Sequence, residues 1–221
     1  MGTLYLFVVL RGNEIAVIIW IIFITEEMTA MYLSYSNKKA CDYIDWSLES
    51  SLNYDEKQGI LCLTYCISEE IAKNTFVREI SQKYTEYKKN KYQKDLENYT
   101  GSNFFGYGKM EEYNLAKDLS YNAFQIYEDE DVIQTVSDYW LTSNINIITV
   151  IPEEYTREKI TYRSLSLAFE QLARECRIRH YKSIIVPKSQ FYRYDLEWEA
   201  VLPIIKDEFR EIEIDIIVTE Q

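Results

Sequence analysis

Glycine, proline and histidine are scarce in this sequence. Its 221 residues include 6 glycines, 3 prolines and one histidine, His180. No GxGxxG or Walker motif is present, so the glycine-rich loops that many nucleotide-binding proteins wrap around phosphates are missing. The 4 cysteines, at positions 41, 62, 66 and 176, form no CxxC pair. This inventory argues against a zinc site, and we predict neither a bound metal nor a cofactor.

Two of the cysteines, Cys62 and Cys66, lie in the apolar run ILCLTYC. An apolar setting indicates buried thiols that behave as small hydrophobic side chains, in a protein of a reducing intracellular compartment such as the cytoplasm. A cysteine nucleophile needs a nearby base, and His180 is the one histidine that the sequence offers for that role.

The chain is strongly acidic, with a net charge of −12 and a pI near 4.7. Apolar residues make up 47% and charged residues 27%, which predicts a folded core rather than disorder. The length suits one domain. Because phosphate backbones repel an acidic protein, we do not expect a nucleic-acid partner. A small anionic ligand held by backbone N–H groups remains compatible with this charge.

Two apolar segments near the amino end, Leu4–Leu10 and Ile15–Ile24, are separated by the polar Arg11–Glu14. The second segment is about half as long as the roughly 20 residues that a membrane-spanning helix needs. A single span over both would carry charged side chains into the bilayer centre at large cost. We therefore predict two strands buried in the main sheet. A membrane anchor is the alternative.

The middle of the chain contains two helical patterns around a polar stretch. Residues 68–90 have apolar side chains at helical spacing, and residues 91–122 are polar with the loop signal TGSNFFGYGK. Residues 129–140 predict a short helix that begins at the acidic run Glu128–Asp131. The apolar positions of the two helices are Phe76, Val77, Ile80, Tyr84 and Tyr87, then Val132, Ile133, Val136 and Trp140.

Strands and helices alternate in the second half, which favours an α/β fold. Ile145–Ile151, Ser183–Pro187 and Ile212–Val218 predict buried strands. Helices are expected over 161–179 and from about 196 to 209, where Pro203 either kinks the helix or marks its first turn. Their apolar stripes are Leu165, Ala168, Phe169, Leu172, Ala173 and Cys176, then Trp198, Val201, Leu202, Ile205 and Phe209.

Three motifs follow one another in this half of the chain. YCISEE (Tyr65–Glu70) ends an apolar strand and opens a helix. NIITVIPEEYTREKITYRSLSLAFEQL and IIVPKSQFYRYDLEWEAVLPIIKDEF each join a strand, a loop and a helix. Their order resembles the ADP-ribose-binding macrodomains, and most nearly the terminal ADP-ribose protein glycohydrolases. The resemblance implies a three-layer α/β fold with a mixed sheet flanked by helices. Residues 59–221 would form this core, with an insertion near 91–122, and residues 1–58 a divergent N-terminal part.

The chain differs from that family in the loops that bind the diphosphate and at the positions of the catalytic residues. The family holds diphosphate with glycine-rich loops, but IAKNT after the first motif and PKSQFYRYD in the third contain no glycine. In the glycohydrolase class a lysine attacks the sugar, and Val150 stands at the matching position. Asp195 lies one residue short of the position of the assisting acid. Valine has no lone pair and cannot act as a nucleophile.

The resemblance implies a ligand site between two loops, which we call the first loop (Tyr65–Glu70) and the second loop (Pro187–Asp195). Some of their side chains have structural alternatives. Ser68 suits a helix N-cap as well as a ligand contact. The aromatic rings would stack on adenine or cover the loop, and the cations would bind diphosphate or stay solvated. The predicted ligand-binding residues are Tyr65, Cys66, Ser68, Glu69, Lys188, Ser189, Tyr192, Arg193 and Tyr194.

These features predict a degenerate macrodomain that binds ADP-ribose or a related nucleotide weakly, without efficient hydrolysis. The alternative is a scaffold that binds a protein partner and whose pocket is filled by Phe191, Tyr192 and Tyr194. A third reading is an active ADP-ribosyl hydrolase that uses Asp195 as its catalytic residue. A membrane partner is not expected unless the amino-terminal segment is an anchor.

Overall fold

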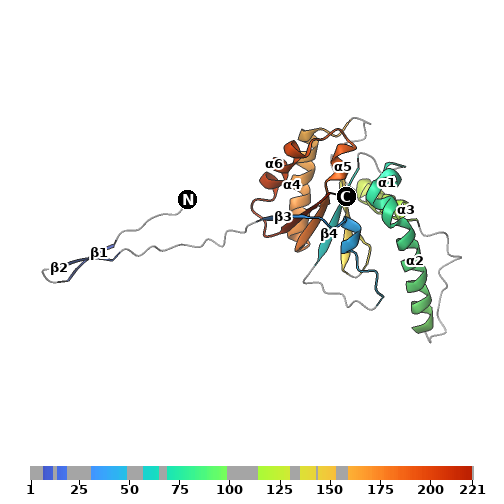
Figure 1. Cartoon of the computed structure of the whole chain (residues 1–221), viewed down its shortest axis with the longest axis horizontal. Helices are drawn as coiled ribbons and strands as arrows, with labels where there is room; N and C mark the ends of the chain where they lie inside the picture. Colours follow the sequence, from blue (N-terminus) through green and yellow to red (C-terminus); the bar gives the residue numbers. More distant parts are fainter. Residues whose placement is uncertain are drawn as a thin grey trace.

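The computed structural model describes residues 7–11, 14–18, 31–48, 57–64, 69–98, 114–129, 135–142, 144–152 and 159–220. Figure 1 shows its elements in chain order. They are β1 (Phe7–Arg11), β2 (Glu14–Ile18), β3 (Tyr32–Ser36), the 3-10 helix η1 (Ala40–Tyr43), β4 (Gln58–Leu63), α1 (Glu69–Lys73), α2 (Thr75–Asn98), α3 (Leu115–Asp129), β5 (Thr135–Trp140), β6 (Ile145–Ile151), α4 (Tyr162–Ile178), β7 (Ser183–Pro187), α5 (Ser189–Tyr192), α6 (Trp198–Glu208) and β8 (Asp215–Thr219).

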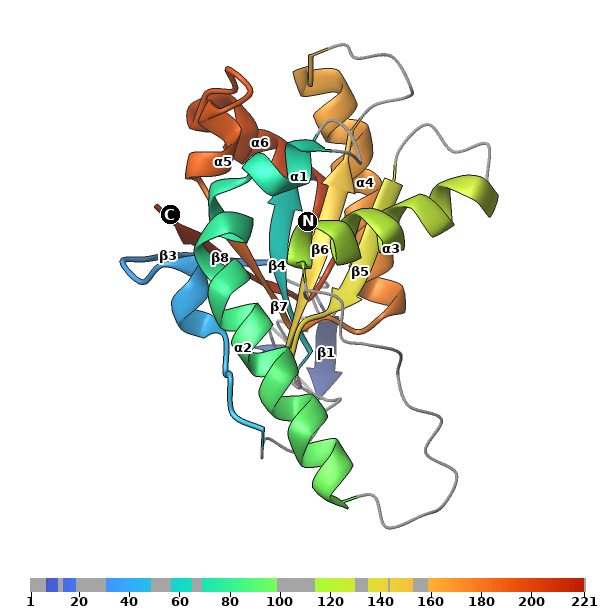
Figure 2. The same ribbon diagram turned by 90° about the vertical axis from the view of Figure 1, so that its right-hand side faces the viewer.

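The main sheet has 6 strands in the order β3-β8-β7-β4-β6-β5. Strands β3, β8, β7, β4 and β6 are mutually parallel, and β5 is antiparallel to β6. Parallel neighbours need long crossover connections, which helices supply here. Helices α4 and α6 lie on one side of the sheet and α1, α2 and α3 on the other (Figures 1 and 2). The predicted three-layer α/β fold, a mixed sheet flanked by helices, is confirmed.

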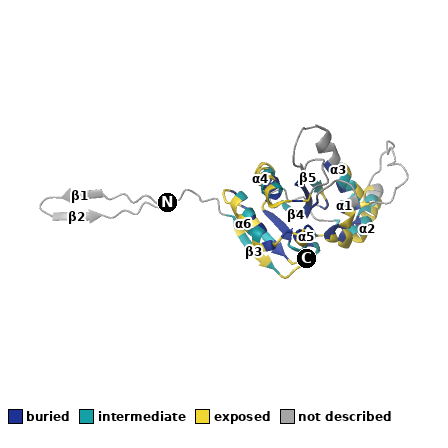
Figure 3. Cartoon of the chain, turned by 90° about the horizontal axis from the view of Figure 1, so that it is seen from above, coloured by how far each residue is buried: buried dark blue, intermediate teal, exposed yellow. Residues whose placement is uncertain are grey.

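Each face of the sheet buries its own hydrophobic cluster (Figure 3). Leu61 and Leu63 of β4 belong to the cluster beneath α4 and α6, whereas Ile60 and Cys62 belong to the cluster beneath α2 and α3. This alternation follows from the pleat of a strand. A strand that is covered on both faces reads as a continuous apolar run, which explains the ILCL pattern.

Helix α4 matches its prediction closely. It spans Tyr162–Ile178, and its buried residues are the whole predicted stripe. Its N-terminus is fixed by a reciprocal cap in which Thr161 Oγ1 accepts from the Ser164 N–H at 3.1 Å and Ser164 Oγ accepts from the Thr161 N–H at 3.0 Å. An N-cap of this type contributes about 1 kcal/mol to stability.

The strands and the last helix of the second half also form where they were predicted. Strands β6 and β7 have the predicted bounds. Helix α6 begins at Trp198, and Pro203 lies inside it rather than at its first turn. Trp198 is buried against Phe191, at a centroid distance of 5.7 Å. Strand β8 begins at Asp215 rather than Ile212, because the chain before it forms a turn.

The cysteine prediction is confirmed for Cys62, which is free and buried in β4. Burial raises the pKa of its thiol to about 12 and so keeps it protonated and unreactive. Cys176 is likewise buried, in α4, and burial raises its pKa. Cys66 lies outside the described residues.

The short helix predicted over 129–140 is wrong. Residues 135–140 form strand β5, which pairs with β6 from Thr135 opposite Ile151 to Trp140 opposite Asn146. Apolar residues three and four apart also occur in strands, and a neighbouring buried strand decides the outcome. Glu128 and Asp129 therefore end α3 rather than begin a helix. The polar stretch 91–122 holds the end of α2 and the start of α3 as well.

The amino-terminal prediction needs one correction. Both apolar segments contain strands, β1 and β2, but these pair antiparallel with each other in a separate 2-stranded sheet. Of the described strands in residues 1–57, β3 joins the main sheet, beside β8. Among the helices that the structure describes, none combines the length and the apolar character needed to cross a bilayer.

Candidate functional site

The two predicted ligand loops follow neighbouring strands of the main sheet, at the carboxyl ends of these strands. Strands β4, β6 and β7 are parallel, so their carboxyl ends lie together. The first loop follows β4 and the second loop follows its neighbour β7. In open α/β sheets ligands bind at this edge, beyond the carboxyl ends of the strands.

Much of the first loop lies outside the described residues, including Tyr65, Cys66 and Ser68. Both readings of Ser68, cap and ligand contact, therefore stand. Glu69 is the first residue of α1, and its side chain is not among those described. The described part of the loop is Glu69 and Glu70, which are the first two residues of α1.

The glycine-free segment IAKNT after the first loop forms the end of α1 and a helix cap. Asn74 separates α1 from α2, and its Oδ1 accepts from the Phe76 N–H at 3.0 Å. Its Nδ2 donates to the Leu63 carbonyl oxygen at 3.3 Å, so the same side chain fixes α2 to the end of β4. Asparagine before a helix is a recognisable N-cap signal, so this cap could have been predicted from the sequence. Motif comparison identified the segment only as a loop that lacks glycine.

The second loop contains the short helix α5, which is anchored in the core. Phe191 is fully buried and contacts the Phe169 ring edge-to-face at 6.3 Å. Lys188 donates its backbone N–H to the Thr219 carbonyl oxygen at 2.7 Å. Ser189 begins α5 and is partly buried. The loop is therefore a packed element of the fold.

Gln190 continues the sheet with its side chain. Strands β4 and β7 pair only from Gln58 to Ile60 of β4. Beyond that point Gln190 Nε2 donates to the Leu61 carbonyl oxygen at 3.2 Å, and its Oε1 accepts from the Leu63 N–H at 2.7 Å. A buried amide thus takes the place of a strand and satisfies backbone groups that would otherwise be unpaired. Sequence reasoning missed this role, which no local pattern signals.

Tyr194 is directed at the same strand end. Its hydroxyl donates to the Leu63 carbonyl oxygen at 3.1 Å, and burial raises its pKa to about 12. Tyr194 is therefore a structural hydrogen-bond donor to β4. Tyr192 is different, because the residue is 51% exposed and the centroid of its ring lies 5.9 Å from Lys188 Nζ.

Arg193 bridges the two loops. Its Nη2 donates to Glu70 Oε2, and its Nη1 donates to the Glu70 carbonyl oxygen at 3.3 Å. The guanidinium also lies 5.4 Å from the centroid of the Tyr194 ring. Glu70 is shared with Lys73, whose Nζ lies 2.6 Å from Oε1. The sequence prediction of Arg193 included no partner, and Glu70 was not among the predicted site residues.

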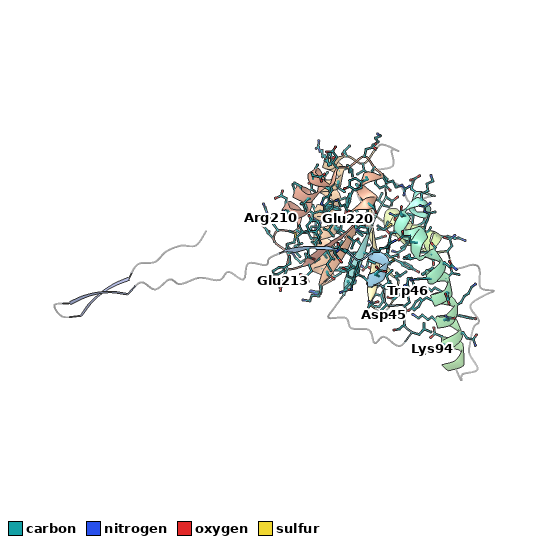
Figure 4. All side chains as sticks on the ribbon, viewed as in Figure 1. Asp45, Trp46, Lys94, Arg210, Glu213 and Glu220 are labelled. Carbon is teal, nitrogen blue, oxygen red and sulfur yellow. The ribbon has the colours of Figure 1, made fainter. Side chains whose placement is uncertain are left out.

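Lys188 also has a carboxylate nearby. Its Nζ lies 3.6 Å from Glu220 Oε1, and Glu220 is labelled in Figure 4. A hydrogen bond with Tyr192 is the main cause that raises the pKa of Lys188. Both cations predicted to hold a diphosphate are thus within ion-pair distance of an acid of the same chain.

Asp195 and Val150 occupy unlike positions. Asp195 has a left-handed backbone with φ of 58°, and its exposed carboxylate pairs with the exposed Lys159 at 3.0 Å. Val150 is fully buried in the cluster beneath α4 and α6, and its carbonyl oxygen accepts from the Thr64 N–H at 3.0 Å. Its side chain lies in the core, with no surface exposure.

A polar network surrounds the buried carboxylate of Asp138, near the amino ends of β4 and β7. It therefore lies at the opposite end of these strands from the two loops. Lys57 Nζ is 2.8 Å and Arg179 Nη1 3.1 Å from Asp138 Oδ2. Burial alone would raise the pKa of Asp138, but hydrogen bonds from Lys57, Tyr181 and Asn146 outweigh it, so the pKa lies below its usual value. Lys57 Nζ also lies 4.4 Å from the centroid of the Tyr181 ring. Each charge of this network has a partner, which is typical of a structural ion pair.

Within the described residues, no three His, Cys, Asp or Glu side chains are grouped closely enough to hold a metal ion.

No protein-family model matches the sequence, and no curated protein matches it. Among the solved structures that are similar to this chain are two macrodomains. The macrodomain of Thermus aquaticus DarG is 12% identical with a TM-score of 0.48, over 87% of this chain and 100% of that one. A macrodomain protein from Streptomyces coelicolor is 10% identical with a TM-score of 0.45, over 86% of this chain and 99% of that one. At these identities no residue role passes from either protein to this chain.

Proposed function

We propose that this chain is a degenerate macrodomain that binds ADP-ribose or a related nucleotide weakly and does not hydrolyse ADP-ribosyl bonds efficiently. The sequence supports this through the order of its three motifs. The fold supports it through the neighbouring positions of β4 and β7, which bring the two loops to one sheet edge.

The observation that carries the proposal is the position of Arg193. A guanidinium that joins the two loops is well suited to a phosphate, because its planar fork can donate two parallel N–H bonds to two phosphate oxygens. Its side chain keeps 25% of its surface exposed, so a ligand can reach it. Tyr192, exposed on the same loop, provides a ring for an adenine to stack on.

We expect weak binding for two reasons. The family's glycine loops offer backbone N–H groups to the diphosphate, and each such bond to a charged group is worth roughly 1.5–3 kcal/mol. Losing two or three of them costs several decades in Kd, which puts the affinity in the high micromolar range or poorer. In addition, a phosphate must displace Glu70 from Arg193 or share the Arg193 guanidinium with the Glu70 carboxylate.

We expect no efficient hydrolysis because the nucleophile position holds a buried valine. Val150 offers no lone pair, and its side chain lies in the core. Asp195 is exposed to solvent, and its carboxylate is paired with Lys159. A general acid or base needs hydrogen-bond reach to the reacting atoms.

Calorimetric titration with ADP-ribose tests the proposal. Wild-type protein should bind weakly, and Arg193→Ala should weaken binding by roughly tenfold or more. Arg210→Ala is the matched control. Arg210, labelled in Figure 4, is an exposed arginine that follows α6 and pairs with Asp207. Equal affinities of the two variants would overturn the role of Arg193. Absence of binding at millimolar ADP-ribose would overturn the nucleotide-binding function.

A second candidate function is a scaffold that binds a protein. It is favoured by the burial of Phe191 and Tyr194, two of the three side chains expected to fill the pocket. In that case the acidic surface would meet the partner. The titration discriminates between the two, because a filled pocket would leave both wild type and Glu70→Gln without ADP-ribose binding.

A further inference from the structure

Strand β3 forms an outer edge of the main sheet. Among the strands that the structure describes, its one neighbour is β8, to which it pairs in parallel from Tyr32 opposite Asp215 to Ser36 opposite Thr219. Two large side chains of this short strand face solvent, with Tyr32 64% and Tyr35 60% exposed. An exposed aromatic pair on an edge strand is typical of a protein interface.

The hydrogen-bond pattern identifies which backbone groups point outward. The Tyr32 N–H donates to the Ile214 carbonyl oxygen at 3.0 Å, so Tyr32 is directed at β8. In a parallel ladder, alternate residues bond to the same neighbour, which directs Ser34 and Ser36 at β8 as well. The N–H and C=O groups of Leu33 and Tyr35 therefore point away from the sheet.

Proteins usually prevent other strands from pairing with such an edge. Charged side chains, a proline or a bulge discourage another strand from pairing there. Strand β3 reads YLSYS and contains neither a charge nor a proline. Its register with β8 is unbroken, so it has no bulge. In a chain of net charge −12, an uncharged edge is a place where two copies meet without charge repulsion within the strand.

We propose that β3 is a self-association surface, on which two copies of this chain pair their β3 strands antiparallel about a two-fold axis at Ser34. This register sets Leu33 opposite Tyr35 of the second copy, and Tyr35 opposite Leu33. It pairs every outward N–H and C=O of the two residues with one from the other copy. The two sheets then form one continuous sheet.

The side chains support the same register. Leu33 and Tyr35 lie on one face of the strand, the face on which Leu33 packs against the cluster beneath α4 and α6. The exposed Tyr35 ring of one copy would cover Leu33 of the other, an aromatic–aliphatic cross-strand pair that occurs twice by symmetry. The strand is thus complementary to itself, which favours a second copy over an unrelated peptide.

Analytical ultracentrifugation of the full chain over a dilution series tests the association. Wild type should show a concentration-dependent dimer, and Tyr35→Lys should raise the dimer dissociation constant by roughly tenfold or more, because it replaces both ring pairs by lysines. Ile178→Lys is the control, since Ile178 is 62% exposed on α4, outside β3, and this variant should dimerise like wild type. A monomeric wild type at every concentration, or equal effects of the two variants, would overturn the proposal.

Disulfide trapping tests the register. Residues that face each other at the two-fold axis in a non-hydrogen-bonded pair have Cα atoms about 4.5 Å apart, within the range that a disulfide spans. Ser34→Cys should therefore form a covalent dimer under mild oxidation, whereas wild type and Ile178→Cys should not. Equal cross-linking of Ser34→Cys and Ile178→Cys would rule out this pairing. A dimer that is not trapped by Ser34→Cys would also rule it out.

Discussion

Arg193 and Glu70 join segments that lie 123 residues apart in the chain. The guanidinium binds the carboxylate of Glu70 and also its carbonyl oxygen, so the second loop is attached to the first turn of α1. This contact spans the place where the proposed ligand would enter. Glu70 therefore competes with any anion for the same guanidinium.

Replacing Glu70 by glutamine should strengthen ADP-ribose binding. Removing the carboxylate releases Arg193 for a phosphate and removes a negative charge beside it. We expect Kd to fall by about tenfold, measured by calorimetric titration. Glu199→Gln is the control, because Glu199 is an exposed acid in the first turn of α6. An unchanged Kd for Glu70→Gln would mean that the ion pair does not restrict the ligand.

Peptides that carry ADP-ribosylated glutamate should remain modified when they are incubated with this protein. Val150 stands where the glycohydrolase class has its nucleophile, and Val150→Lys alone should not restore turnover. Positioning of the sugar supplies a large share of the rate, and the glycine loops that would position it are missing. The new amine would also lie in the core, at a cost in stability.

Mass spectrometry of the peptides measures this outcome, with an active macrodomain as positive control. Clear turnover by the wild-type protein would contradict the pseudoenzyme proposal. Asp195 would then be the first residue to replace.

Gln190→Ala should destabilise the fold. It leaves the Leu61 carbonyl oxygen and the Leu63 N–H without their partners inside the protein. Unpaired buried groups cost about 1–3 kcal/mol each, so we expect a loss of roughly 2–4 kcal/mol in the free energy of unfolding by urea. Gln171→Ala, on the partly exposed side of α4, should cost less than about 0.5 kcal/mol. Similar losses in both variants would mean that Gln190 does not act as a substitute strand.

Acid should destabilise the protein partly through Asp138. Its folded-state pKa is lower than its unfolded value, which is about 3.9, so its stabilisation is present above that pH and is lost as the pH falls through the folded value. Asp138→Asn should be less stable by roughly 2–3 kcal/mol at pH 7, because Lys57 and Arg179 lose their shared partner.

The same variant should lose less stability than wild type when the pH falls from 5 to 2. Urea titrations across this range measure the difference. Parallel curves for the two proteins would show that Asp138 is not the titrating group.

The parts of the fold that could be predicted are those where one local pattern determines the outcome. In α4 the spacing of the stripe, the cap at Thr161 and the polar outer face all agree. In β6 and β7 the apolar run is short and ends at a proline. Strand β5 was missed because its identity depends on pairing with β6, a contact that its own residues do not encode.

The candidate site was harder to predict, because its side chains form hydrogen bonds with backbone groups that are distant in the sequence. Motif comparison led to Arg193 and Tyr194, but not to their partners Glu70 and Leu63. Gln190 carried no signal at all, since its partners are the Leu61 and Leu63 backbone groups more than a hundred residues earlier. Roles of this kind become visible only when the strands are placed beside one another.

The position of β8 has a consequence for how the protein is made. This strand lies between β3 and β7, and its pairing with β3 joins residues 32–36 to residues 215–219. On the ribosome, β3 must therefore wait without a partner until β8 has been synthesised, about ten seconds or more at 5–20 residues per second. During that interval its uncharged edge is exposed on both sides. Nascent chains on neighbouring ribosomes would meet through this same segment on either of its two sides, and the pairing of β8 with β3 removes one of them.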